Sequence, residues 1–295
     1  MKNGVIVYMS REEDCGLLYS SILLLYKNFN SKYRYPIVVF HDNITKMTVS
    51  KILVSLYNEL GFVPKIQWEF LRFEHPDHVS TDEKMYDPPL SRFWMGYRHM
   101  CRFQSGEIYK HPALMNYDWY WRLDSDSFIL SEINYDVFEY MDKNEYEYAF
   151  LKEYRKDCGF VTVNLWETTK KFMRENSITP LSLNDKLKNG DWECDIFYTN
   201  FEIAKFSFFR GSEYTSYYNY LDSTGMIYYN RWGDAPIHWL GVHMFLPDSK
   251  IWRVEDISYL HKDWARNTKY MNESSLRFVP EPFKSVAIST AKEGL

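Results

Sequence analysis

Two carboxylates, one residue apart, follow an apolar segment in the middle of the chain. Asp124 and Asp126 come directly after residues 119–123, Trp-Tyr-Trp-Arg-Leu, a run typical of a buried strand. Alternate side chains of an extended chain point to the same side, so the two carboxylates could bind one ligand together. A divalent cation held there could bind a diphosphate, because hard cations prefer oxygen ligands. Two aspartates in a turn also commonly accept hydrogen bonds from backbone amides, so the pair alone leaves both interpretations open.

Three further polar residues stand in segments that could do chemistry. Glu202 lies among apolar neighbours, where a carboxylate either has a structural partner or serves as base or nucleophile at a reacting carbon. Asp234 lies within Arg-Trp-Gly-Asp-Ala-Pro, which also fits the start of a helix with Asp234 as its N-cap. His261 ends a strand-like run, and its structural alternative is a hydrogen-bonded surface imidazole.

The elements that must position these residues begin with a regular alternation. Residues 4–9, 35–40 and 66–73 are apolar runs typical of strands. The segments between them carry apolar stripes at helical spacing, and Gly61 is a typical stop for the second helix. This alternation predicts an α/β fold with a mostly parallel, doubly wound sheet. Ligands bind such sheets beyond the carboxyl ends of the strands, which is where Asp124 is expected to lie.

The second half of the chain is less regular. Its pattern predicts helices at 91–105, 136–143 and 170–176, a strand that ends at Asp124, and a further strand at 148–154. Residues 182–191 are polar and predict a connector. From Lys262 onward the chain is again polar, so this extension wraps the surface, pairs with another subunit or is disordered.

Composition excludes some classes of partner. Of the 295 residues, 45% are apolar and 25% are charged, as in ordinary soluble domains. The formal net charge of −5 argues against nucleic acid as a partner, and no apolar run is long enough for a membrane anchor. The 19% aromatic content suits stacking on sugars or bases but also the filling of a core. The four cysteines lack metal-ligand spacing and are expected to be buried free thiols, with one disulfide as the alternative.

Several short segments of the chain, taken together and in order, fit the pattern of one known family. The segments are residues 97–103, 105–106, 109–114, 120–122, 200–203, 231–236, 256–257 and His261. In this order they resemble the fungal α-1,2-mannosyltransferases of the Kre2/Mnt1 type, over most of the chain. The resemblance implies a GT-A-type glycosyltransferase fold. Its sheet would be Rossmann-like and mostly parallel, with helices on both faces, and mixed in the acceptor half.

The resemblance also implies a domain organisation and an activity. Residues 1–261 would form a single catalytic domain, with a nucleotide-binding half at about 1–126, an acceptor half at about 127–261, and a C-terminal extension at 262–295. The enzyme would transfer mannose from GDP-mannose to a hydroxyl group of a mannoside or glycan, with retention of configuration and formation of an α-1,2 linkage. Mn²⁺ or another divalent cation would be its cofactor. Two alternatives are a retaining transferase of another nucleotide sugar and a non-catalytic glycan-binding homologue.

Each candidate site residue matches a position of the family. The resemblance assigns metal binding to Asp124, Asp126 and His261, catalysis to Glu202 and Asp234, and donor binding to Tyr97, Arg11, Asp42 and Arg122. Glu202 falls on the carboxylate proposed as nucleophile. Retention requires either a covalent glycosyl intermediate or attack on the same face as the departing group, and Glu202 could serve either mechanism.

Two departures separate this chain from the family pattern. The family's Glu-Pro-Asp metal motif is replaced by Asp-Ser-Asp, which shortens the first carboxylate, Asp124, by one methylene. Family members are usually type II membrane proteins of the Golgi, whereas this chain begins at the catalytic domain. We therefore expect a soluble protein, cytoplasmic if Met1 is the native start and in the Golgi or secretory lumen if the chain is part of an anchored one.

Overall fold

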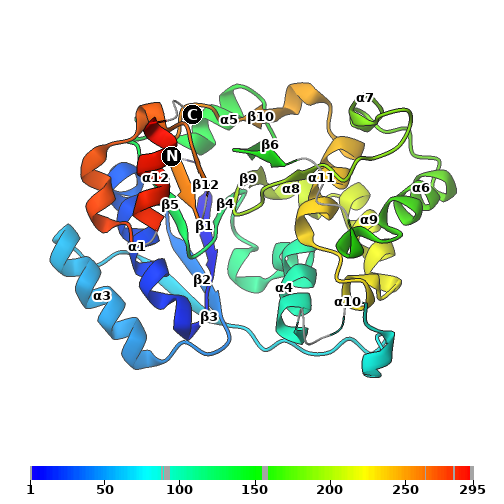
Figure 1. Ribbon diagram of the computed structural model, residues 1–295, viewed down its shortest axis with the longest axis horizontal. Helices are drawn as coiled ribbons and strands as arrows, with labels where there is room; N and C mark the ends of the chain where they lie inside the picture. The colour runs from blue at the N-terminus through cyan, green and yellow to red at the C-terminus, as the bar shows by residue number, and fades with distance from the viewer. Residues whose placement is uncertain are drawn as a thin grey trace.

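A seven-stranded sheet runs through the centre of the molecule in the order β10-β6-β9-β4-β1-β2-β3 (Figure 1). The computed structural model describes residues 2–87, 89, 94–154, 159–262, 264–281 and 283–292. The strands of the central sheet are β1 (Gly4–Met9), β2 (Ile37–His41), β3 (Ile66–Phe70), β4 (Trp119–Leu123), β6 (Tyr148–Phe150), β9 (Phe201–Lys205) and β10 (Ile251–Arg253).

The direction of the strands determines which loops meet at one edge of the sheet. β3, β2, β1 and β4 are parallel neighbours, whereas β9 runs antiparallel to both β4 and β6. The predicted mostly parallel sheet with a mixed second half is therefore confirmed. Because β9 is reversed, the residues that precede it lie beside those that follow β4. The backbone N–H of Asp124 accordingly donates to the carbonyl oxygen of Asn200 at 3.2 Å.

Helices cover both faces of the central sheet (Figure 1). Ile6 and Tyr8 of β1 are buried in one apolar cluster with α1, α3 and α5, while Val5 and Val7 are buried in a second cluster with α4, α9 and α11. Full burial of such a side chain stabilises the fold by about 1.5–3 kcal/mol. The helices are α1 (Cys15–Leu25), α2 (Ser31–Tyr33), α3 (Lys46–Leu60), α4 (Met95–Ser105), α5 (Val137–Lys143), α6 (Leu165–Glu175), α7 (Leu183–Lys186), α8 (Phe206–Arg210), α9 (Ser212–Ser223), α10 (Met226–Tyr229), α11 (Asp234–Phe245) and α12 (Phe283–Lys292).

A smaller antiparallel sheet brings the end of the chain back to β4. It consists of β5 (Ser127–Ile129), β11 (Tyr259–His261) and β12 (Trp264–Arg266), with β11 in the middle. The register pairs His261 with Ser127, which places the imidazole beside the turn that links β4 to β5. α12 packs against this sheet, and its Ala287 is buried together with Phe128 and Leu260. The described part of the polar C-terminal segment therefore wraps the surface of the fold.

Three predicted elements differ from those observed. The strand predicted at 148–154 is two strands, because the chain leaves the central sheet after β6 and β7 (Glu153–Tyr154) pairs with β8 (Ile196–Phe197) instead. The helix predicted at 170–176 begins earlier, as α6, because Leu165 and Thr169 are buried with Phe172 on one face. The predicted connector at 182–191 contains α7. The helix predicted at 91–105 is observed as α4, and residues 91–93 lie outside the described residues.

The cysteines follow the prediction in part. Cys15 and Cys101 are buried free thiols, as expected, whereas Cys194 is disulfide-bonded, so the expectation of a free thiol is wrong there. Cys158 lies outside the described residues. Within the part of the chain that the structure describes, no helix has both the length and the apolar character needed to cross a membrane.

Candidate active site

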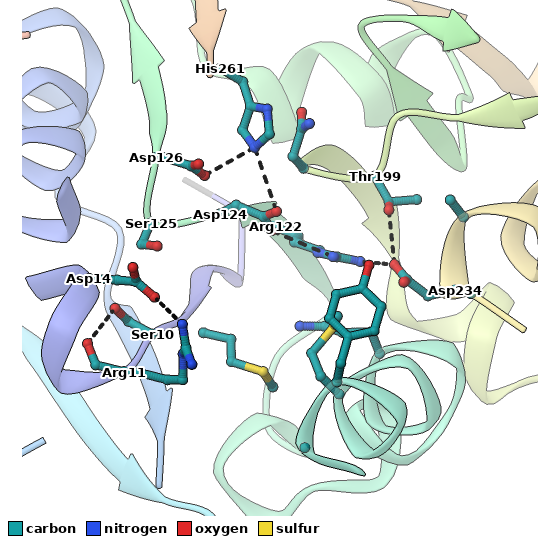
Figure 2. A pocket seen from close by; sticks show the side chains of 18 of the residues that line it. Ser10, Arg11, Asp14, Arg122, Asp124, Ser125, Asp126, Thr199, Asp234 and His261 are labelled. Atoms are coloured by element: carbon teal, nitrogen blue, oxygen red, sulfur yellow. Dashed lines mark hydrogen bonds and ion pairs between the residues drawn. The ribbon is translucent and has the colours of Figure 1, made fainter. Parts of the chain in front are cut away.

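A cleft of about 840 Å³ opens where the first parallel strands end (Figure 2). Arg11 lines it after β1, Asp42 after β2 and Asp124 after β4, while residues from α4 and the first turn of α11 line it as well. The carboxyl ends of parallel strands are the usual ligand-binding edge of such sheets. The cavity therefore lies where the sequence predicts the chemistry.

Asp124, Asp126 and His261 meet in this cleft, as predicted (Figure 2). Each offers one ligand atom, and these atoms lie within 4.8 Å of one another. The Nε2 atom of His261 is 3.0 Å from Oδ1 of Asp126 and 3.9 Å from Oδ2 of Asp124. The turn after β4 supplies both carboxylates, and the pairing of β11 with β5 supplies the imidazole. We refer to these three residues as the metal triad.

The metal triad fits a divalent cation. The buried Nε2 atom of His261 makes no hydrogen bond to any described residue, although Asp126 is near it. A buried polar atom without a partner costs stability, so its presence in a cleft points to a missing ligand. Burial alone would raise the pKa of Asp126, but His261 and Lys262 outweigh burial and hold that pKa below its usual value. Two carboxylates and one imidazole are a donor set that suits Mn²⁺ and similar cations.

A buried ion pair stands beside the metal triad. Nη1 of Arg122 donates to Oδ2 of Asp234 at 2.6 Å, and the hydroxyl of Thr199 donates to the same oxygen at 2.9 Å (Figure 2). Nη2 of Arg122 lies 3.5 Å from Oδ1 of Asp124, so the guanidinium links the two acidic groups. Burial raises the pKa of Asp234, but Arg122, His238 and the Thr199 hydrogen bond together hold it below its usual value. Asp234 therefore faces the cleft as a carboxylate.

The start of α11 explains how Asp234 reaches this position. The helix begins at Asp234 itself, with Gly233 as N-cap in an extended conformation. The alternative interpretation of Asp234 as the N-cap of this helix is therefore excluded. Its carboxylate is bound to Arg122 of β4 and to Thr199, and these contacts fix the N-terminal end of α11 against the central sheet.

Glu202 lies behind this pair and is fully buried. Its carboxylate accepts hydrogen bonds from Tyr120, from Tyr148 at 2.6 Å and from Nδ1 of His238 at 2.7 Å. Burial raises the pKa of Glu202, but His238, Arg122 and Tyr120 outweigh it and lower that pKa below its usual value. Glu202 is absent from the described residues that line the cleft. Its assignment as a catalytic residue stays a prediction.

The residues assigned to donor binding, Tyr97, Arg11, Asp42 and Arg122, all line the cleft. The hydroxyl of Tyr97 accepts a hydrogen bond from Nη2 of Arg231 at 2.6 Å. Arg11 forms ion pairs with Glu13 at 2.8 Å and with Asp14 at 3.3 Å. These contacts orient the side chains at the wall of the cleft, while their role in donor binding remains a prediction.

Two residues of this site were not identified from the sequence. Thr199 binds Asp234, and His238 binds Glu202. For His238 a signal exists, because it follows Asp234 by four residues, the spacing at which two side chains share one face of a helix. For Thr199 there is none, since its contact depends on the reversed direction of β9.

Comparison with known proteins shows what the whole chain is similar to. Residues 1–275 match the family described as "Glycolipid 2-alpha-mannosyltransferase". The probable mannosyltransferase KTR3 of Saccharomyces cerevisiae is 36% identical over 284 residues, which covers 90% of this chain and 68% of that protein. Glycolipid 2-alpha-mannosyltransferase 2 of Candida albicans is 36% identical over 282 residues, 89% of this chain and 59% of that protein. The chain thus spans about two thirds of the length of these relatives.

Solved structures agree with the fold. Core-mannan synthase A of Aspergillus fumigatus, crystallised in an Mn/GDP form, is 25% identical and superposes with a TM-score of 0.82. The match covers 98% of this chain and 85% of that one. The predicted GT-A-type glycosyltransferase fold is therefore confirmed.

Proposed function

Because the chain belongs to the glycolipid 2-alpha-mannosyltransferase family, we propose that it transfers mannose from GDP-mannose to a hydroxyl group of a mannoside or glycan. Transfer proceeds with retention and forms an α-1,2 linkage. One observation carries the proposal: a single cleft contains both the metal triad and the buried Arg122–Asp234 pair. A sugar diphosphate needs both, because negative charge develops on its phosphate as positive charge develops on its sugar.

The metal triad would hold the divalent cation, Mn²⁺ in this proposal. When bound, the cation supplies Lewis acidity to the diphosphate leaving group. Asp126 contributes an ionised carboxylate, since its pKa lies below its usual value owing to His261 and Lys262, which outweigh burial. The backbone pairing of β11 with β5 holds His261 in place, and its ring edge contacts Tyr198 at a centroid distance of 5.4 Å. These contacts limit the reorganisation needed when the donor binds.

Asp234 acts on the sugar from the wall of the cleft. Its ionised carboxylate is fixed by Arg122 and Thr199, so it stabilises developing positive charge without having to move. Glu202 lies deeper and already accepts three hydrogen bonds. A nucleophile must approach the reacting carbon to about 3–3.5 Å. The burial of Glu202 therefore favours a role as a fixed negative charge over a role as nucleophile.

The remaining wall residues bind the donor. Arg11 and Asp42 follow β1 and β2, which places them at the nucleotide-binding edge of the sheet. Tyr97 lies on α4 with its hydroxyl bound to Arg231, so an aromatic ring and a cation face the cleft together. We assign this pair to the sugar diphosphate and the acceptor glycan to the open side of the cleft.

The disulfide at Cys194 supports an oxidising compartment as the site of action. Disulfides persist in secretory compartments and are rare where cellular thiols are kept reduced. We therefore place the activity in the secretory lumen. Labelling of free thiols in the protein isolated from its native cells checks this, because a fully labelled Cys194 would contradict it.

A donor screen tests the proposed function. The protein is incubated with GDP-mannose, UDP-glucose or UDP-galactose and with methyl α-mannoside as acceptor, in Mn²⁺ or in EDTA. We expect transfer from GDP-mannose in Mn²⁺ alone, with an α-1,2 linkage in the NMR spectrum of the product. Transfer from a UDP-sugar in place of GDP-mannose, or equal transfer in EDTA, would contradict the proposal.

A further inference from the structure

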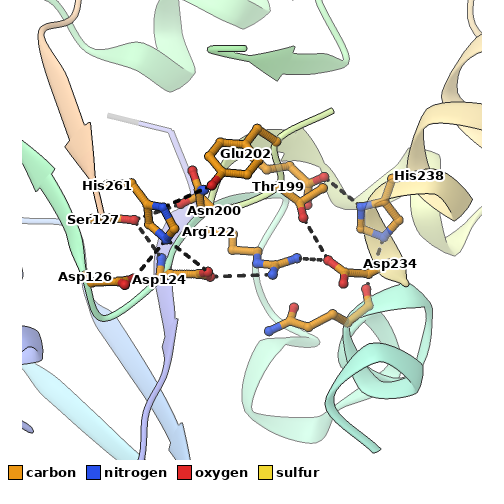
Figure 3. A network of polar contacts seen from close by, with 12 residues as sticks. Arg122, Asp124, Asp126, Ser127, Thr199, Asn200, Glu202, Asp234, His238 and His261 are labelled. Carbon is orange, nitrogen blue, oxygen red and sulfur yellow. Dashed lines mark hydrogen bonds and ion pairs between the residues drawn. The ribbon is translucent and has the colours of Figure 1, made fainter. Parts of the chain in front are cut away.

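A fully buried polar network forms the rear of the site (Figure 3). Glu202 of β9 and His238 of α11 each have 0% of their surface exposed. The hydroxyl groups of Tyr120 and Tyr148 donate to the Glu202 carboxylate from neighbouring strands. Leaving one of these groups without its partner would be costly, because water cannot replace it. The network is therefore rigid.

The ring of His238 contacts Glu202 on one side and two polar groups on the other. Its Nδ1 atom is 2.7 Å from Oε2 of Glu202, and its Nε2 atom is 3.1 Å from both the backbone carbonyl oxygen of Gln104 and the hydroxyl of Tyr109. An ionised carboxylate can only accept, so Nδ1 donates to Glu202. Nε2 can donate to the carbonyl oxygen or accept from the hydroxyl, so the donation to Glu202 does not depend on the charge of the ring. The lowered pKa of Glu202, for which His238 is the largest cause opposing burial, agrees with an ionised partner.

This buried pair connects directly to the wall of the cleft. His238 lies one helical turn after Asp234 on α11, and Arg122 stands directly opposite Glu202 in the register of β4 and β9. Arg122 in turn donates to Asp234. These contacts link two strands and one helix, with Arg122 and Asp234 lining the cleft and Glu202 and His238 behind them (Figure 3).

We infer that His238 is a positioning residue: through its buried Nδ1–H it keeps Glu202 ionised, and it ties Glu202 to α11, the helix that carries Asp234. This inference rests on the proposed function. A developing positive charge on the sugar would then face two carboxylates that are ionised and fixed before the reaction begins, one held by His238 and the other by Arg122. Preorganised charge of this kind needs no rearrangement at the moment of transfer.

The inference predicts a pH effect. The titratable and charged groups that face Glu202 are His238 and Asp234 of α11, Tyr120 and Arg122 of β4, Tyr148 of β6, Tyr109 after α4, and Tyr214 of α9. Without the imidazole of His238, the largest influence that opposes burial is lost and the pKa of Glu202 rises. Activity that needs ionised Glu202 is then lost at a higher pH than in the wild-type protein. The acid limb of the profile of kcat against pH should therefore move to higher pH.

His243 provides a matched control on the same helix. It is also buried, but it binds Ser182 through Nδ1 at 3.0 Å, and it is not among the described residues that line the cleft. Burial lowers the pKa of His243 to about 3, so this ring is neutral. His243→Gln therefore removes a buried histidine from α11 without changing the charge near Glu202.

The test compares His238→Gln with His243→Gln in mannose transfer from GDP-mannose and in GDP binding with Mn²⁺. For His238→Gln we expect kcat to fall roughly 10²-fold, the scale of a misplaced catalytic group, with GDP affinity nearly unchanged and the acid limb at higher pH. His243→Gln should keep the wild-type kcat and acid limb. Tyr148→Phe, a milder change that removes one hydrogen bond to Glu202, should shift the acid limb the same way but less.

The inference is overturned if His238→Gln retains the wild-type kcat, if it loses GDP affinity in proportion to kcat, or if it matches His243→Gln in every measurement. If His238→Gln does not fold, an unchanged acid limb in Tyr148→Phe would overturn it instead. A wild-type protein that binds GDP with Mn²⁺ but transfers no mannose would contradict the proposed function and not the role of His238.

Discussion

The two ends of the site differ in how completely their polar groups are satisfied. In the metal triad, Asp124 is 39% exposed and the buried Nε2 atom of His261 has no hydrogen-bond partner among the described residues. In the pair of Arg122 and Asp234, both side chains are nearly buried, at 6% and 9% exposure, and their charged atoms meet at 2.6 Å. The metal triad therefore needs a partner from outside the protein, whereas Arg122 and Asp234 satisfy each other.

This difference separates two tasks. A group of ligands that is incompletely paired can bind a cation without first breaking strong contacts. A charged group that must act on a transition state works best when its contacts are already made. The comparison therefore assigns binding of the diphosphate to the metal triad and stabilisation of the sugar to Asp234 and the network behind it.

The largest expected effect comes from Asp234→Asn. Loss of one well-placed charge costs roughly 10²–10³ in rate, so kcat should fall by that factor. The melting temperature should fall too, because Arg122 keeps only the more distant Asp124 as a counter-charge, and breaking a buried ion pair costs up to about 3–5 kcal/mol. Kinetics in Mn²⁺ and thermal unfolding measure the two effects.

Asp222→Asn is the matched control for this change. Asp222 accepts two hydrogen bonds from Arg102, at 2.7 and 2.9 Å, and is not among the described residues that line the cleft. It should lower the melting temperature and leave kcat unchanged. Equal losses of kcat in the two variants would show that Asp234 acts only through stability.

An intermediate effect is expected within the metal triad. Asp126 is nearer to His261 than Asp124 is, and Asp124 is partly engaged by Arg122. Asp126→Asn should therefore weaken Mn²⁺ binding by at least roughly 10- to 100-fold, the range already seen when a mere outer-shell partner of a metal ligand is removed, and Asp124→Asn by less. Electron paramagnetic resonance of free Mn²⁺ measures both constants. If Asp124→Asn weakens Mn²⁺ binding more than Asp126→Asn does, Asp124 is the stronger ligand, as the first carboxylate of the family's metal motif, and the distances above do not decide the order.

Much of the metal triad could be predicted from the sequence. The strand that ends before Asp124 and the run that ends at His261 are readable as apolar segments, and the family motifs align both. The buried network could not be predicted in the same way. Glu202, His238 and Tyr148 come from separate elements, and their contacts depend on β9 lying antiparallel between β4 and β6. Strand order of this kind is not encoded in local periodicity.

The smallest expected effect concerns stability in acid. The folded-state pKa of Glu202 is lowered, with the charge of His238 as the main cause that outweighs burial. Its contribution to stability is therefore present above the unfolded pKa of about 4.3 and is lost as pH falls through the lower folded value. One such group adds a slope of up to about 1.4 kcal/mol per pH unit. Urea unfolding between pH 5 and pH 3 gives the free energy of unfolding at each pH. Its decrease with falling pH should be less steep for Glu202→Gln than for the wild-type protein. An equally steep decrease would contradict an ionised Glu202 in the folded protein.

The separation of tasks is tested most directly by calorimetry of GDP binding in Mn²⁺ and in EDTA, with wild type, His261→Ala and Asp234→Asn. We expect Mn²⁺ to strengthen GDP binding strongly in the wild-type protein and in Asp234→Asn, because the metal triad is intact in both. His261→Ala should lose most of that gain. An equal gain from Mn²⁺ in His261→Ala, or its loss in Asp234→Asn, would contradict the assignment of the two ends of the site to different tasks.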